Sequence, residues 1–328
     1  MNRASLRALV PVLALCASAF PSRAAGPSSG LEARLRAIGA ESGGALGVKV
    51  VHLESGRSAG LDERGRYPMA SAYKLAIALA FLAEVDAGRR TLEDEVEVRP
   101  GELRRTGSRV DPWTPGVPVA AGKLLERMLT ESDNTACDVL LRLLGGPRAV
   151  DAWLASKGFG EVDVSWTELE MAAVESGVSP VPAPGTCDHA CLDALVAKVP
   201  KARREEAERA FESDERNTAS PADLARLLVV LRKGELLSPK STGTVLGTMA
   251  RNRTGDRRIR ALLPNGTPVQ DKTGTIGRSA IDVGLVGLPG GKGTLAVAVF
   301  VKGSTKGSEA RERAIAEAAK AAFDAFAR

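Results

Sequence analysis

The sequence predicts an α+β fold, an α/β sandwich in which an antiparallel sheet is flanked by helices from both termini and carries an inserted all-helical lobe. Two observations predict it: β-rich segments lie near both ends of the chain, and the middle has apolar residues at helical spacing. We expect the sheet lobe over about 28–66 and 262–328 and the helical lobe over about 67–261. The cleft between the lobes is the natural place for a functional site.

Residues 1–24 have the pattern of a secretory signal peptide. A basic start, MNRASLR, precedes an apolar stretch too short to span a membrane, and small residues at 22–24 offer a cleavage site. The alternative is a lipoprotein signal at Cys16, although Leu15 is bulky where such a site favours a small residue. We therefore expect residues 25–328 to form one periplasmic or secreted domain, with no further stretch able to cross a bilayer.

The elements of the sheet lobe are recognised by their periodicity. The segment SGLEARLRAIGAES (29–42) is amphipathic at helical spacing, and GVKVVHLES (47–55) alternates as a strand before a turn and a second strand. Three further β-rich segments and a long amphipathic helix follow near the other end, at 267–275, 279–288, 293–304 and 306–328.

The middle of the chain is predicted to be helical. Helices are expected from Ser71 onward, over 119–132, over 133–147 with a stop at Gly145-Gly146-Pro147, over 149–160, and over 220–235 after a Ser220 cap. Residues 174–217 fit this pattern poorly, because they combine a Pro- and Gly-rich run with a strongly charged one. They are expected to form a surface insertion.

Composition excludes several classes of protein. The formal net charge is +5, but Arg3, Arg7 and Arg23 lie in the expected leader, so the rest of the chain is closer to neutral. Aromatic residues, which would stack on bases, make up only 4% of the chain. We therefore expect no nucleic-acid partner.

The cysteines outside the leader are too few for disulfide bonds to stabilise a domain of this size. Cys187 and Cys191 are expected to form a local disulfide; the alternative is metal binding with His189, which gives one ligand too few for a closed zinc site. Cys137 lies in an apolar helical run and is expected to be a buried thiol. We expect no metal and no cofactor.

Ser71 and Lys74 stand one helical turn apart in YPMASAYKLA, on one face of the predicted helix. They are either a nucleophile beside its base or the polar start of a buried helix. The chain has only two histidines, His52 in a strand and His189 in the insertion, so a Ser-His-Asp triad is hard to build. If the serine reacts, its base must be a lysine or a carboxylate.

Two further motifs decide between these readings. Ser132-Asp133-Asn134 lies at a junction between two predicted helices, and Lys-Thr-Gly-Thr (272–275) lies on a predicted strand. With Ser71-x-x-Lys74, this set resembles the penicillin-recognising serine enzymes and most closely the class A β-lactamases. The resemblance extends over nearly all of the chain after the leader, and includes GGP, NTASPADLARLL and RTGDRRIRALLPNG.

The resemblance implies that Ser71 attacks a strained amide carbonyl and becomes acylated. Lys74 would take the serine proton, which requires an unprotonated amine; burial and the nearby Lys272 are expected to lower its pKa. The backbone N–H groups of Ser71 and Thr275 would form the oxyanion hole. Ser132 would pass a proton to the departing nitrogen, while Asn134 would hold Lys74 and the substrate amide.

The substrate carboxylate is expected near the Lys-Thr-Gly-Thr strand. The resemblance assigns its binding to Lys272, Thr273, Gly274 and Thr275, assisted by an arginine. Arg258 matches the position of that arginine in some members of the family, and Arg257 and Arg260 are the alternatives. Trp113 is either an aromatic edge for the substrate or a packing residue.

Hydrolysis of the acyl-enzyme needs a carboxylate that activates water. The familiar Glu-Pro-x-Leu-Asn motif is absent, and TELEMAA (167–173) stands in its place. Glu168 is the candidate, because Glu-x-x-Met resembles a subgroup of the family, and Glu170 is the competitor. Ala172 stands where relatives carry a residue that helps to hold the water, which puts fast turnover in question.

The sequence therefore predicts a serine hydrolase that opens β-lactam antibiotics through an acyl-enzyme, with a small-molecule β-lactam as its partner and a monomeric state. The alternatives are a D,D-peptidase-like enzyme and a penicillin-binding sensor, which are acylated but turn over slowly. The insertion over 174–217, longer than in the family, could cover the cleft, tilt Glu168 or have no role.

Overall fold

The computed structural model of the protein describes residues 28–328, so the predicted signal peptide lies outside the described residues. Its centre is a five-stranded antiparallel sheet in the order β2-β1-β11-β10-β9. The strands are β1 (Ala45–His52), β2 (Ser58–Leu61), β9 (Val269–Ile276), β10 (Ser279–Gly287) and β11 (Thr294–Lys302). Strands from both ends of the chain thus form one sheet, and the predicted α+β fold is confirmed.

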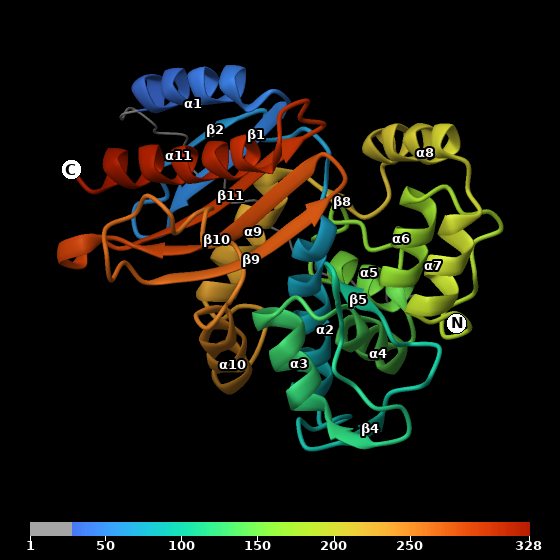
Figure 1. Ribbon diagram of the computed structural model, residues 1–328. Coiled ribbons are helices and arrows are strands. Elements are labelled where there is room, and N and C mark those ends of the chain that lie inside the picture. The colour runs from blue at the N-terminus through green and yellow to red at the C-terminus, as the bar shows by residue number, and fades with distance from the viewer. Residues whose placement is uncertain (1–27) are drawn as a thin grey trace, which may run out of the picture.

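Helices cover both faces of the sheet (Figure 1). Helices α1 (Ser28–Ser42) and α11 (Ser308–Phe326) pack against each other and on the outer face, and α9 (Pro221–Arg232) packs on the inner face. On β11, Val297 and Val299 belong to the outer hydrophobic cluster, whereas Ala298 and Phe300 belong to the inner one. Because successive side chains point to opposite faces, a strand buried on both faces is apolar throughout, as β11 is.

The helical part of the molecule surrounds α2, whose residues 74–82 are all buried. The remaining elements are short strands and helices, and η denotes a single 3₁₀ turn. They are β3 (Tyr67–Pro68), η1 (Ala70–Tyr73), α2 (Lys74–Asp86), β4 (Glu95–Glu97), β5 (Arg105–Thr106), β6 (Arg109–Val110), β7 (Pro118–Ala120), α3 (Ala121–Thr130), α4 (Asn134–Leu144), α5 (Pro147–Ser156), α6 (Glu168–Glu175), β8 (Thr218–Ala219), α10 (Pro239–Met249) and η2 (Pro289–Gly291).

Two helices, α7 (His189–Ala197) and α8 (Lys201–Ser213), lie within the range expected for the surface insertion. Cys187 and Cys191 form a disulfide at the start of α7, and Cys137 is a buried free thiol. The division into two lobes at residues 66 and 262 stays a prediction; α9, within the range expected for the helical lobe, packs on the sheet. No helix within residues 28–328 is long and apolar enough to span a membrane.

The inner face of the sheet gives a test of the core. Phe300 is fully buried, and its ring lies 5.4 Å from that of Tyr67, centroid to centroid. We expect Phe300→Ala to lower the free energy of unfolding by about 3–5 kcal/mol, because it leaves a cavity where the sheet meets the helices. Phe300→Leu, which keeps most of the volume, should cost less than about 1.5 kcal/mol. Urea unfolding followed by tryptophan fluorescence measures both; equal losses would contradict this account.

Candidate active site

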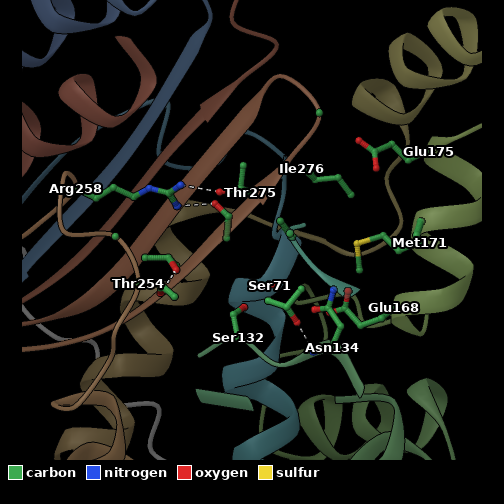
Figure 2. A pocket seen from close by; sticks show the side chains of 18 residues that line it. Ser71, Ser132, Asn134, Glu168, Met171, Glu175, Thr254, Arg258, Thr275 and Ile276 are labelled. Carbon is green, nitrogen blue, oxygen red and sulfur yellow. Dashed lines mark hydrogen bonds between the residues drawn. The ribbon is translucent and has the colours of Figure 1, made fainter. Parts of the chain in front are cut away.

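A cavity of about 500 Å³ lies between the edge strand β9 and the helical part of the molecule. Figure 2 shows Ser71, Ser132, Asn134 and Glu168 on its helical side, and Arg258, Thr254 and Thr275 on its sheet side. Most of the residues predicted from the sequence therefore meet in one cavity. Its lining also includes Thr106, Met171, Ala172, Glu175, Thr273, Gly274 and Ile276.

Ser71 stands in η1, directly before helix α2, and is half-buried at the cavity wall. The residue before it, Ala70, has a φ of 43°, a left-handed conformation that is strained for a residue with a Cβ. Strand β9 packs closely on this turn: a Cβ at Gly274 would come within 2.5 Å of the Met69 carbonyl oxygen. Only glycine at this position lets the strand approach the serine.

Lys74, the first residue of α2, is fully buried, and its ammonium group lies among oxygen atoms from two other segments. Nζ donates to the Ser132 carbonyl oxygen at 2.7 Å and to Oδ1 of Asn134. It also lies 3.0 Å from Oε1 of Glu168. These contacts join the Ser-x-x-Lys and Ser-Asp-Asn motifs to helix α6.

The charge state of Lys74 differs from the sequence-based expectation. Burial, the largest influence, lowers the pKa of Lys74, but the Glu168 carboxylate leads a group of neighbours that outweighs it, so the net pKa is raised. The lysine with a lowered pKa is Lys272, which burial and then the nearby Lys74 charge bring to about 7. The expectation that burial and Lys272 lower the pKa of Lys74 overall was wrong, because it did not include the ion pair with Glu168.

Lys272 lies behind the cavity wall rather than in it. Its side chain is fully buried, and Nζ donates to Oγ of Ser132 at 3.0 Å and to the Thr273 carbonyl oxygen at 2.8 Å. Ser132 itself has a φ of 59° and lines the cavity. Lys272 therefore does not line the cavity itself but donates to a hydroxyl that does, and its role in binding a substrate carboxylate stays a prediction.

The Ser-Asp-Asn turn is fixed by hydrogen bonds at the start of α4. The Asp133 side chain accepts from the Ala136 N–H at 2.8 Å and caps the helix. It also accepts from Nε1 of Trp113 at 2.9 Å, so this tryptophan supports the turn and does not line the cavity. Of the two roles expected for Trp113, the structure places it in the packing one. Asn134 donates from Nδ2 to the Arg105 carbonyl oxygen at 2.7 Å.

The two candidate carboxylates at the start of α6 have different surroundings. Glu168 is 8% exposed, lines the cavity and pairs with Lys74. Glu170 turns back to the helix start, where Oε2 accepts from both the N–H and the hydroxyl of Thr167 at 2.9 Å in a capping box. The geometry therefore assigns Glu170 to the helix cap and places Glu168 in the cavity.

Beneath Glu168 lies an ion pair that the sequence analysis missed. Oδ1 of Asp138 accepts from the backbone N–H of Glu168 at 2.7 Å, and Oδ2 accepts from Nε of Arg104 at 2.8 Å. Burial, countered in part by Arg104, raises the pKa of Asp138 to about 6. Both residues lie in segments that read as ordinary loop and helix, so no local pattern could have identified them.

Arg258 is the arginine that lines the cavity. One of its terminal nitrogens donates to Oγ1 of Thr275 at 2.6 Å, and the other donates to the Gly274 carbonyl oxygen at 2.8 Å. Arg257 is exposed at the surface and lies near Glu309, whereas Arg260 pairs with Asp271. The structure thus places only the first of the three alternatives at the site.

The sequence analysis also missed Thr254 and Glu175. The Thr254 hydroxyl lies 2.6 Å from the Thr273 hydroxyl, and both line the cavity. Glu175 lies at the end of α6; burial, and to a smaller extent the Glu208 carboxylate, raise its pKa to about 7. Thr254 lies in the quoted RTG run, which could have drawn attention to it, whereas Glu175 carries no recognisable signal.

Residues 28–328 contain no cluster of three His, Cys, Asp or Glu side chains arranged to hold a metal. The alternative of a metal site at Cys187, His189 and Cys191 is replaced by the disulfide between the two cysteines. At the cavity, Ser71, Ser132 and Glu168 lie near the buried amines of Lys74 and Lys272. Groups of these types are suited to acyl transfer.

This fold and this cavity define a class A serine hydrolase of the kind that acts on β-lactams. A family model described as the β-lactamase enzyme family matches residues 30–326, and the chain belongs to that family. The predicted resemblance is confirmed. The protein is accordingly a class A type β-lactamase, an enzyme that hydrolyses β-lactams.

Individual relatives agree with this assignment. The chain is 28% identical to β-lactamase VEB-1 of Pseudomonas aeruginosa, over 86% of this chain and 85% of the relative. It is 30% identical to the extended-spectrum β-lactamase PER-1 of the same species, over 79% and 75%. Among solved structures, the TLA-1 extended-spectrum β-lactamase superposes with a TM-score of 0.73 at 26% identity, covering 92% of this chain and 99% of that one.

The lowered pKa of Lys272 leads to a prediction for pH dependence. In the free enzyme this amine loses its positive charge as the pH rises through about 7, so the attraction for an anionic β-lactam weakens. We expect kcat/KM to fall above that pH. Lys272→Arg keeps the charge throughout and should move the fall to higher pH. Initial rates between pH 5.5 and 9.5 measure both profiles; coincident profiles would contradict the assignment.

Proposed function

We propose that this β-lactamase works through an acyl-enzyme on Ser71 and that Glu168 activates the water that releases it. The observation that supports the proposal most strongly is the position of Glu168: its carboxylate lines the same cavity as Ser71 and lies 3.0 Å from the Lys74 ammonium group. A carboxylate held near a nucleophile and shielded from bulk solvent is suited to general-base catalysis.

In the acylation step, Oγ of Ser71 forms a bond to the β-lactam carbonyl carbon and its proton passes to the Glu168 carboxylate, relayed by water or by Lys74. Lys74 is protonated at rest, so it cannot take the proton before giving its own to Glu168. The negative charge on the carbonyl oxygen would be stabilised by the backbone N–H groups of Ser71 and Thr275. Strand β9 supports this role, because it is an edge strand with unpaired backbone groups beside η1.

The ring then opens when the bond between the carbonyl carbon and the nitrogen breaks. The nitrogen takes a proton from the Ser132 hydroxyl, which receives a replacement from a lysine ammonium group. The proton held by Glu168 then passes to that lysine by way of Lys74, so the carboxylate is ionised again before deacylation. Both Lys272, at 3.0 Å, and Lys74, at 3.5 Å, donate to Oγ of Ser132. Arg258 and the hydroxyl of Thr275 would bind the substrate carboxylate on the opposite wall.

In the deacylation step, water adds to the ester carbonyl carbon and gives its proton to Glu168. The bond between that carbon and Oγ of Ser71 then breaks, and Oγ regains a proton from Glu168 by way of Lys74. The net reaction consumes one water molecule and yields the ring-opened product. The location of Glu168 favours this turnover over the alternative of a D,D-peptidase-like or sensor protein that stays acylated.

The role of Glu168 is tested by trapping the intermediate. We expect Glu168→Gln to accumulate a stable acyl adduct on Ser71, because the amide cannot accept the proton of the attacking water. Acylation continues, because the carboxylate that raises the pKa of Lys74 is gone and the amine can then take the serine proton itself. Turnover of a chromogenic cephalosporin should fall by a factor on the order of 10²–10⁴, the usual contribution of a general base. Hydrolysis rates and the intact mass of the protein after mixing measure the two effects.

Glu170→Gln is the matched control two residues away. It keeps a side-chain oxygen that can accept in the capping box, so its stability and turnover should stay close to those of the unchanged protein. If Glu170→Gln traps the adduct and Glu168→Gln turns over normally, the roles of the two carboxylates are reversed. A lasting adduct on the unchanged protein would favour the slowly turning over alternative.

We further propose that the protein is an exported monomer, supported by the signal-peptide pattern of residues 1–24. When the full chain is expressed in a Gram-negative host, we expect activity in the periplasmic fraction and a mass that corresponds to cleavage after Ala24. Size-exclusion chromatography should give the mass of one chain. A lipid attached at Cys16, or activity confined to the cytoplasm, would contradict the export proposal.

A further inference from the structure

We propose that the insertion between α6 and β8 positions Glu168 for deacylation, and that Phe211 on α8 is the positioning residue that acts through Trp166. The proposal rests on the function of Glu168 proposed above. Helix α6, which begins with Glu168, has only eight residues. A helix this short is marginal in water, so tertiary contacts must fix its direction and place.

The first contact is made at the start of α6. The ring of Phe211 stacks on that of Trp166 with centroids 5.6 Å apart, and both side chains are buried. The guanidinium of Arg216, just after α8, lies 4.4 Å from the centroid of the same indole. Trp166 is two residues before Glu168, so the stack holds the backbone from which the catalytic carboxylate projects.

The second contact is made at the end of α6. A Cβ at Gly177 would lie 3.1 Å from the Cβ of Ala207, so α8 packs directly against the residues that follow α6. Helix α8 thus contacts the chain both before and after α6, and the two helices lie next to each other in Figure 1. It restrains the whole short helix and not only its first turn.

The far side of α8 is tied to the sheet. Nε of Arg278 donates to Oε1 of Glu212 at 2.8 Å. Arg278 lies in the turn between β9 and β10, three residues after Thr275, whose N–H is proposed for the oxyanion hole. Helix α8 therefore links α6, which carries the water-activating carboxylate, to the strand on the opposite wall of the cavity.

A third contact reaches Glu168 from below. The Cys187 carbonyl oxygen, beside the disulfide, accepts from a terminal nitrogen of Arg104 at 2.7 Å. Arg104 pairs with Asp138, which accepts from the backbone N–H of Glu168. The start of the insertion thus binds Arg104, which through Asp138 holds the start of α6. The insertion therefore restrains Glu168 both through this chain and through the aromatic stack on Trp166.

The test separates acylation from deacylation. We expect Phe211→Ala to leave the acylation rate of a chromogenic cephalosporin within about threefold of the unchanged protein and to slow deacylation about tenfold or more. In acylation the proton reaches Glu168 through a relay of water or Lys74, which tolerates a small displacement. In deacylation Glu168 must align the attacking water directly, and small displacements of such a group cost large factors in rate. Stopped-flow absorbance and rapid-quench mass spectrometry give the two rate constants. Accumulation of the acyl adduct is a result that a loss of general stability would not produce.

Matched variants keep the test decisive. Phe211→Tyr keeps the stack and should restore deacylation, whereas Arg209→Ala, on the exposed face of α8, should change neither rate. Arg216→Gln removes the cation over the indole together with the exposed ion pair to Asp214, and because the residue is exposed the fold should be kept. It should slow deacylation by a few-fold, and it provides the test if Phe211→Ala does not fold.

Equal slowing of acylation and deacylation, or normal deacylation in both folded Phe211→Ala and folded Arg216→Gln, would overturn the positioning role. That failure is distinct from failure of the proposed function. If Glu168→Gln traps the adduct while the Phe211 and Arg216 variants turn over normally, Glu168 acts as proposed and the insertion does not position it. If Glu168→Gln traps nothing, the proposed function itself is wrong.

Discussion

The Lys74 ammonium group is fully buried, and the arrangement of the cavity follows from the groups that surround it. A buried charge is costly unless an opposite charge and hydrogen-bond acceptors replace its water. Here they come from the turn before α4, which supplies the Ser132 carbonyl oxygen and Asn134, and from α6, which supplies Glu168. Two segments distant in sequence are thereby brought to one helix start, immediately beside Ser71. The ion pair that satisfies this constraint also raises the pKa of Lys74, whereas burial and the nearby Lys74 charge lower the pKa of Lys272.

The sheet forms the opposite wall of the cavity, and its edge strand must come very close to the turn that carries Ser71. Strand β9 lies at the edge of the sheet and packs on the serine turn, which only a glycine at position 274 permits. The same strand presents Thr275, whose hydroxyl is held by Arg258, and carries Lys272 behind the Ser132 hydroxyl. The cavity is thus a meeting of two surfaces, one from the sheet and one from the helices, and the reactive groups lie where those surfaces meet.

Helix α6 depends on tertiary contacts for its position in the site. It has eight residues, its start is held by a capping box, and its backbone is tied to Asp138. The insertion adds the aromatic stack on Trp166 and the chain of contacts through Arg104. Because a short helix gains little stability from its own hydrogen bonds, the precision of the carboxylate depends on such packing. This gives the surface insertion a physical reason to lie against the catalytic helix.

The sequence by itself determined the α+β class, most of the helices and strands, and the set Ser71, Lys74, Ser132, Asn134 and Lys-Thr-Gly-Thr, because hydrophobic periodicity and motif composition are local properties of the chain. Only the tertiary structure decided between Glu168 and Glu170, separated Arg258 from its neighbours, assigned Trp113 to the support of a turn, and revealed Asp138 and Arg104. It also reversed the expected direction of the pKa shift of Lys74. These properties depend on distance and burial between segments far apart in the chain, and no local pattern encodes them.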